Sequence, residues 1–144
     1  MKRNLFYLLP LLLALGAACS PKGDSTPIPQ PQGTFKGSFG ALVKKASGAG
    51  YDTIRDTALI INLAANSRFA VTGDTIKHAA SKGSFAYNGV YIQFNDSSKV
   101  VTGTGAKFHL KGVYQYGYNG TVFQLQRLST GDTSNIVYNF KKIN

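Results

Sequence analysis

Few residues of this 144-residue chain are of types that carry out chemistry. The chain has one cysteine, two histidines and six aspartates, and it has no glutamate. Zinc needs three or four nearby ligands, and thiol catalysis needs a free cysteine beside a base. His78 and His109 stand apart from each other and from the aspartates, at no recognisable ligand spacing. We therefore expect neither a metal site nor a cofactor.

Hydrolysis of a glycoside would need two carboxylates held roughly 5–10 Å apart across a cleft. Asp52 and Asp56 flank Arg55, which predicts an ion-pair cluster on the surface. His109 is predicted to face solvent and His78 to lie in a polar loop, so neither is expected to act as a general base. We predict that the protein is not an enzyme. The carboxylates weighed for this role, all of which are predicted to lie in turns, are Asp52, Asp56, Asp74, Asp96 and Asp132.

The single cysteine, Cys19, directly follows a short apolar segment. Two basic residues come first, the apolar run follows, and small residues occupy positions 16–18. This pattern is typical of bacterial lipoproteins, in which a lipid-bearing cysteine becomes the first residue after cleavage. We expect residues 1–18 to be a removable signal peptide and Cys19 to be the lipid attachment site. The alternative is an ordinary secretory peptide that ends near a cysteine.

Residues 19–32 have the composition of a tether. They include four prolines and almost no apolar side chains, and alternating prolines favour an extended polyproline conformation. The lipid would therefore attach a folded domain to the membrane without using the surface of that domain. Ser20 replaces the aspartate that tends to retain lipoproteins at the inner membrane, so we expect an outer-membrane location, on the periplasmic side or at the cell surface.

Residues 33–144 are numerous enough for one compact domain and too few for two. This domain has no cysteine, so apolar burial has to stabilise it without a disulfide. Once the signal peptide is removed, 14 basic residues remain against six aspartates. We interpret this basic charge as lysines on the outer faces of strands, which discourage aggregation. The alternative interpretation is that the charge attracts anionic lipid or polysaccharide. Nucleic acid is not an expected partner, because the domain has no basic run longer than two residues.

Apolar and polar side chains alternate through most of the domain. A period of two indicates strands with one buried face, and we therefore predict an all-β fold. The predicted strands are Phe35–Val43, Leu59–Leu63, Phe69–Val71, Phe85–Tyr87, Val90–Phe94, Phe108–Tyr118, Phe123–Arg127 and Ile136–Phe140.

Glycines mark the turns and bends of this predicted sheet. Asn88-Gly89 and Asn119-Gly120 lie between alternating runs and predict type I′ hairpin turns, which make consecutive strands neighbours. Gly37, Gly83 and Gly112 each follow a lysine inside or beside a strand. We interpret them as bends where the sheet coils, and the alternative is a bare backbone approached by a ligand.

Eight short strands joined by hairpins either stack as a sandwich or close into a barrel. Closure removes both sheet edges, so we predict an antiparallel up-and-down meander that closes into a small barrel. The segments 33–37, 110–116 and 138–142 resemble the lipocalin-like members of the calycin group, in particular small lipocalin-like lipoproteins of Gram-negative bacteria. Phe35 stands where lipocalins usually have tryptophan. The resemblance implies that a late basic residue, Arg127 or Lys142, packs over that ring.

The inward face of the predicted barrel is rich in aromatic side chains. They either fill the barrel or line a pocket for a small ligand at its mouth. The residues predicted to line such a pocket are Phe39, Phe85, Ile92, Phe94, Tyr114, Tyr116 and Phe123. Our leading hypothesis is a lipid-anchored envelope protein that binds a small apolar ligand or an envelope component. The alternative is a filled barrel whose basic outer face binds a protein or an anionic glycan.

Overall fold

The computed structural model describes residues 29–144, except 74, 101, 103–105 and 129–132. The signal peptide, Cys19 and most of the tether therefore lie outside the described residues. The described part forms eight strands: β1 (Gly33–Lys44), β2 (Tyr51–Leu63), β3 (Arg68–Gly73), β4 (Ser81–Tyr87), β5 (Tyr91–Asp96), β6 (Gly112–Tyr118), β7 (Val122–Leu128) and β8 (Thr133–Lys142). No helix among these residues is long and apolar enough to cross a membrane.

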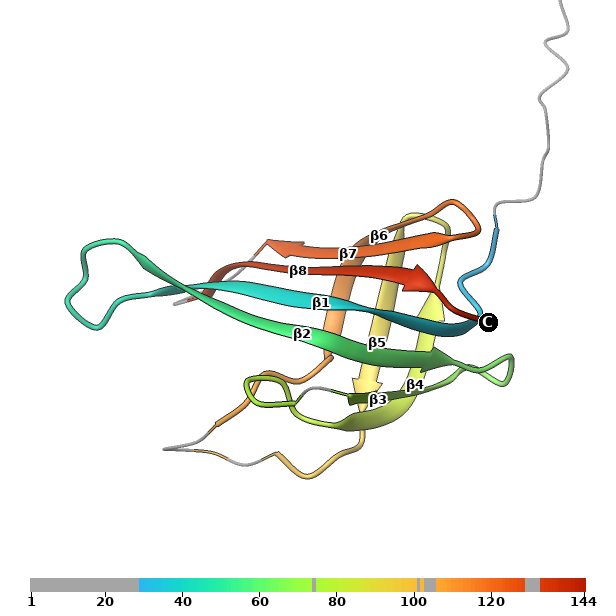
Figure 1. Ribbon diagram of the computed structural model, residues 1–144, viewed down its shortest axis with the longest axis horizontal. Coiled ribbons are helices and arrows are strands. Elements are labelled where there is room, and N and C mark those ends of the chain that lie inside the picture. Colours follow the sequence, from blue (N-terminus) through green and yellow to red (C-terminus); the bar gives the residue numbers. More distant parts are fainter. Residues whose placement is uncertain (1–28, 74, 101, 103–105, 129–132) are drawn as a thin grey trace, which may run out of the picture.

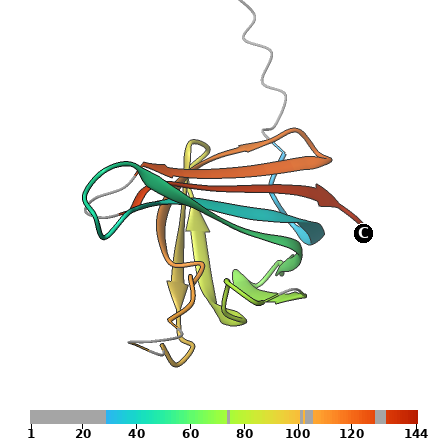
Figure 2. The ribbon, with the colours of Figure 1, turned by 60° about the vertical axis from the view of Figure 1, so that its left-hand side comes forward.

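The strands form a closed barrel with a radius of 9 Å. Each strand pairs antiparallel with the next one in the chain, and β8 pairs antiparallel with β1. β1, β2, β7 and β8 run side by side along the long axis, while β4, β5 and β6 cross them steeply (Figure 1). A second view shows the same two strand directions (Figure 2). The predicted all-β meander and its closure are thus confirmed.

The interior of the barrel is apolar and aromatic. The residues predicted to alternate inward along β1, namely Phe35, Phe39 and Ala41, are at most 3% exposed. The largest side chains of the core touch one another, as in the pairs of Phe39 with Tyr138 and Phe35 with Phe123, whose ring centroids lie 5.1 and 5.3 Å apart. Burial of apolar surface and these ring contacts stabilise the closed sheet.

The alternation of β2 breaks once. Gly37 of β1 is opposite Leu59, whereas Phe39 is opposite Asp56, so β2 has one extra residue between these pairs. Ala58 in this interval has a φ of 60°, which is the left-handed conformation found in some β-bulges. A one-residue shift reverses which side chains of a strand face the core. The bulge therefore turns Asp56 inward.

Two of the predicted bends are places where strands approach closely. A Cβ atom on Gly37 would lie 1.9 Å from the carbonyl oxygen of Asn139 in β8, and a Cβ on Gly83 would lie 1.9 Å from that of Asn95 in β5. Gly37 also precedes the register shift between β1 and β2. Glycine at these positions lets the sheet coil tightly enough to close.

The Asn-Gly pairs do join neighbouring strands, but they form a turn of a different type from the one predicted. Tyr87 pairs with Ile92 and the N–H of Asn88 donates to the carbonyl of Tyr91, so the central residues of the first turn are 89 and 90. Gly89 has a positive φ. A turn with positive φ only at its first central residue is of type II′, whereas type I′ needs positive φ at both central residues. The second turn is also of type II′, because Gly120 is its first central residue and has a positive φ.

The sixth strand is shorter than predicted. It was expected to start at Phe108, but β6 starts at Gly112, which has a φ of +96°. Phe108 instead forms an isolated parallel bridge with His78 from the segment between β3 and β4. This long-range pairing takes Phe108 and its neighbours out of the sheet, so the alternation in the sequence does not continue as a strand there.

Candidate functional site

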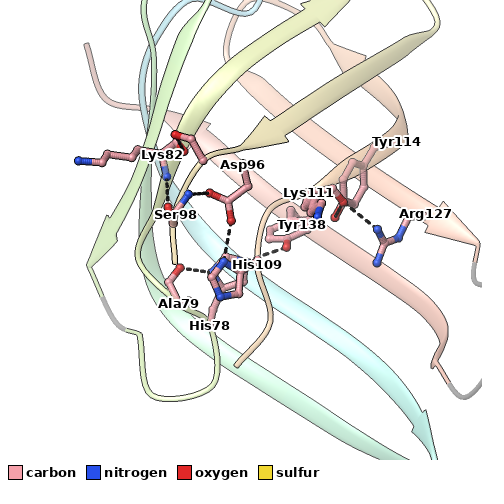
Figure 3. Close-up of polar contacts among 11 residues, drawn as sticks. His78, Ala79, Lys82, Asp96, Ser98, His109, Lys111, Tyr114, Arg127 and Tyr138 are labelled. Atoms are coloured by element: carbon pink, nitrogen blue, oxygen red, sulfur yellow. Dashed lines mark hydrogen bonds and ion pairs between the residues drawn. The ribbon is translucent and has the colours of Figure 1, made fainter. Parts of the chain in front are cut away.

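The polar groups of the interior gather where two loops pair across one end of the barrel. The N–H of Ala79 donates to the carbonyl of Phe108 at 2.7 Å, and the N–H of Phe108 donates to the carbonyl of Lys77 at 3.0 Å. The ammonium group of Lys107 donates to the carbonyl of Thr75. These bonds hold the loop that contains His78 against the segment before β6. Figure 3 shows the side-chain contacts around His78.

Asp56 supports this loop from inside the barrel. Its carboxylate accepts hydrogen bonds from the backbone N–H of Lys77 through both oxygens, at 3.0 and 2.8 Å, and from the N–H of His78. The prediction of a surface cluster around Arg55 is therefore wrong for Asp56, which is 3% exposed. The bulge in β2 is the reason. Asp52 stays on the surface, where it pairs with Lys45 at 3.8 Å.

We expect Asp56→Asn to lower the free energy of unfolding by about 2 kcal/mol, because charge-assisted bonds to buried N–H groups would be lost. Urea denaturation measures this change. The matched control is Asp52→Asn, for which exposed pairing predicts a change below about 0.5 kcal/mol. Equal effects of the two substitutions would contradict the role assigned to Asp56.

His78 is buried, and the prediction that it is solvated in a polar loop is wrong. It is 0% exposed, and its ring packs against Phe39 and Tyr138. Nδ1 lies 2.9 Å from the carbonyl oxygen of Ala79, which only accepts, so Nδ1 bears the proton. Nε2 then accepts from the Tyr138 hydroxyl at 2.8 Å. Burial lowers the pKa of His78 to about 4.

Two buried tyrosines extend this polar cluster. Burial raises the pKa of the Tyr138 phenol well above its ordinary value, and it also raises the pKa of Tyr114. The rings of the two tyrosines pack edge to face at 5.8 Å. The hydroxyl of Tyr114 donates to the carbonyl of Lys111. Both phenols therefore stay neutral at physiological pH, and they satisfy their hydrogen bonds inside the barrel.

Arg127 lies over a different ring from the one that the lipocalin resemblance implies. Its guanidinium carbon is 5.2 Å from the centroid of the Tyr114 ring, and its Nη1 donates to the carbonyl of Lys111 at 2.7 Å. The ring of Phe35 instead contacts Tyr118 and Phe123. The expectation that Arg127 packs over Phe35 is therefore wrong. Arg127 is opposite Ile136 near the start of β8, whereas Phe35 is opposite Lys142 at the end of β8.

His109 also differs from its prediction. Its side chain is 10% exposed, and Nδ1 lies 2.6 Å from Oδ2 of Asp96, whose side chain is 1% exposed. The outward direction was predicted from strand alternation, but His109 precedes β6 and is not part of the strand. Burial raises the pKa of Asp96, but hydrogen bonds from Ser98 and His109 outweigh it and lower the pKa below its ordinary value. Asp96 and His109 thus link the end of β5 to the segment before β6.

The residues predicted to line a ligand pocket all lie on the inner side of the barrel. Phe39, Ile92, Phe94, Tyr114 and Phe123 are at most 1% exposed, Phe85 is also buried, and Tyr116 is partly buried. They contact one another through ring pairs such as Phe85–Phe94 and Phe94–Tyr114. Their inward direction agrees with the predicted alternation. Contact with a ligand stays a prediction.

Two hollows formed by described residues open on the outside of the barrel. One has a volume of about 400 Å³ and lies over β1, β2 and β8, with Arg55 and Asn135 among its lining residues. The other, of about 380 Å³, lies over β6, β7 and β8, with Gln115 and Gln126 among its lining residues. These hollows were not predicted from the sequence. The sequence pattern that could have revealed them is the occurrence of glycines and of residues with amide side chains at outward positions of neighbouring strands.

The buried polar cluster has the contacts of a structural element. The lone pair of His78 Nε2 is occupied by Tyr138, and the oxygens of Asp56 are occupied by backbone N–H groups. Within the described part of the chain, no three side chains of the metal-binding types come together. Groups that line the two outer hollows, such as Arg55 and Gln126, are by contrast exposed to solvent.

No protein-family model, curated protein or solved structure matches this chain significantly. The fold and the site geometry are thus the basis for any statement about function.

Proposed function

We propose that this chain is a non-enzymatic, lipid-anchored envelope protein whose filled, lipocalin-like barrel binds an anionic glycan on its outer face. One observation carries this proposal. The aromatic side chains that were expected to surround a ligand pack against each other, whereas two hollows formed by described residues lie on the outside of the barrel. A barrel of eight strands is narrow enough for side chains to fill.

The charge of the outer wall supports an anionic partner. The strands β1, β6, β7 and β8 contain no aspartate, and lysines occupy outward positions such as Lys36 and Lys141, which are opposite each other in β1 and β8. After removal of the signal peptide, 14 basic residues would remain against six aspartates. A surface with mainly positive charge raises the local concentration of polyanions and speeds their encounter with the protein.

The expected lipid anchor supports the same proposal from the other end of the chain. Attachment through Cys19 and the proline-rich tether would hold the barrel near the outer membrane. No part of the barrel wall would then be needed for membrane contact, since the acyl chains supply the membrane affinity. The outer wall would be available to polymers of the envelope.

Binding of a small apolar ligand is the second candidate, and one feature favours it. Tyr87, Tyr116 and Tyr118 are partly buried against the core near the turns that follow β4 and β6. The rings of Tyr87 and Tyr116 lie 6.3 Å apart. Aromatic side chains at the mouth of a barrel are a common lining for apolar ligands.

Two titrations of the full chain distinguish these candidates. We expect binding to polygalacturonate that weakens roughly tenfold at high salt, because the attraction is electrostatic and screened by ions. The neutral, fully methyl-esterified polymer is the control and should bind far more weakly. We expect no saturable uptake of a dansylated fatty acid. Fatty-acid uptake that Tyr116→Ala abolishes, without binding to polygalacturonate, would overturn the proposal in favour of the second candidate.

A further inference from the structure

The two hollows on the outside of the barrel adjoin each other. Val137 and Asn139 of β8 line both of them. The strand register places five outward residues in one row across the wall, in the order Gln115, Gln126, Val137, Gly40 and Arg55. We call the surface along this row the outer groove. It crosses β6, β7, β8, β1 and β2, and four strand spacings make it about 19 Å long.

Glycines form the floor of the outer groove. Gly40 of β1 and Gly117 of β6 have an ordinary extended backbone, and no atom lies within 4 Å of where a Cβ would stand. In contrast, Gly37 and Gly83 are tightly packed against backbone atoms. Packing therefore accounts for glycine at Gly37 and Gly83 but not at Gly40 and Gly117. The missing side chains at Gly40 and Gly117 leave the backbone open to an approaching ligand.

Amide side chains form much of the wall of the groove. Gln124 donates to the Oδ1 of Asn139 at 2.9 Å, across the pair β7–β8. Each amide both donates and accepts hydrogen bonds, which suits the hydroxyl groups of a sugar, since these also do both. Outward amides on three neighbouring strands therefore offer repeated contacts to a polyhydroxylated chain.

Arg55 provides the charge at the β2 end of the groove. It is exposed, and a guanidinium pairs with a carboxylate through two parallel hydrogen bonds. The one carboxylate residue that borders the groove is Asp56, and its oxygens accept bonds from Lys77 and His78 on the inner side. The charge of Arg55 is thus not neutralised by a carboxylate within the lining.

We infer that the outer groove is the binding site for a uronic-acid-bearing glycan chain, which lies across β6, β7, β8, β1 and β2 with a carboxylate at Arg55. This inference rests on the proposed function and names its site and ligand class. The amides bind the hydroxyl groups, the glycine floor admits the sugar rings, and Arg55 selects for a carboxylate.

Filling the floor of the groove tests the site by steric exclusion. In the full chain, Gly40→Val and Gly117→Val add a side chain where nothing lies within 4 Å, and valine favours strands. We expect each to weaken binding of an oligogalacturonate about tenfold, measured by calorimetric titration. The matched control is Ala86→Val, an exposed position on β4 away from the groove, which should bind as well as the unmodified chain.

A pair of arginine substitutions tests the charge contact. Arg55→Gln in the groove and Arg68→Gln on β3 are both exposed and change the net charge equally. We expect the first to weaken oligogalacturonate binding about tenfold and the second less than twofold. Thermal melts of each variant confirm that the barrel is folded.

The outcomes separate the inference from the proposed function. If all variants bind as tightly as the unmodified chain and binding remains salt-sensitive, the outer groove is excluded while glycan binding stands. If the unmodified chain binds no polyanion, both are excluded. Self-association of the unmodified chain that Gly40→Val abolishes, without oligogalacturonate binding, would make a second copy the occupant and would also overturn the inference.

Discussion

Replacing Gly37 by alanine should lower the free energy of unfolding by about 3 kcal/mol or more. The new Cβ would lie 1.9 Å from the carbonyl oxygen of Asn139 and 2.7 Å from the Cα of Phe140. Both atoms belong to the backbone of β8, so the clash is relieved only if the two strands that close the barrel move apart. Overpacking in a region that cannot relax has costs of this size or larger. Urea denaturation followed by circular dichroism measures the change.

The same strand offers a control. Gly40 lies three residues later in β1, and a Cβ there would meet no atom within 4 Å. Gly40→Ala should leave the stability unchanged or raise it slightly, because alanine loses less backbone entropy than glycine on folding. If Gly37→Ala is no more destabilising than Gly40→Ala, the close approach of β1 and β8 is not what closes this barrel.

The second large effect is a loss of stability in acid that His78 causes. The pKa of His78 is lowered from 6.5 to about 4 in the folded state, so folding favours the neutral ring. The stabilisation is complete above pH 6.5. It decreases as the pH falls toward 4, because the unfolded chain takes up a proton that the folded chain excludes. At about 1.4 kcal/mol per pKa unit, the loss is about 3 kcal/mol.

Several groups around His78 contribute to this pKa. Burial is the largest cause and lowers it, and His109 lowers it further. The carbonyl of Ala79 and the carboxylates of Asp56 and Asp96 raise it. Burial outweighs these contributions because the ring is enclosed by the aromatic core, and a charged imidazolium would lose its hydration.

Two measurements check the acid effect. In an NMR titration of the folded protein, the His78 ring should remain neutral down to about pH 4. The slope of unfolding free energy against pH between 6.5 and 4 should decrease in His78→Gln, whose side chain retains an acceptor for Tyr138 but does not titrate. A folded-state transition of His78 near pH 6.5, the value for a solvated ring, would contradict the prediction.

Local patterns in the sequence predicted eight strands and the closed architecture, but β2 begins eight residues earlier than predicted, so that Asp52 and Asp56 lie in a strand and not in a turn, and β6 begins four residues later. Alternation along segments such as 35–43 and 59–63 gave the strands and their buried faces, since a pleated strand places successive side chains on opposite sides. The Asn-Gly pairs located two hairpins, although the register made Gly89 rather than Asn88 the first central residue. Short strands joined in order, with many inward aromatic side chains, then favoured closure.

The polar interior and the outer groove depend on contacts between distant parts of the chain, which no local pattern records. The bulge at Ala58 becomes visible only once β2 is paired with β1, and it is this bulge that turns Asp56 inward. His78 is buried because its loop pairs with Phe108, 30 residues away. The outer groove requires residues of five strands in one row. Strand alternation follows from each residue's neighbours in the chain, but register, loop pairing and surface shape follow only from how those strands pack together.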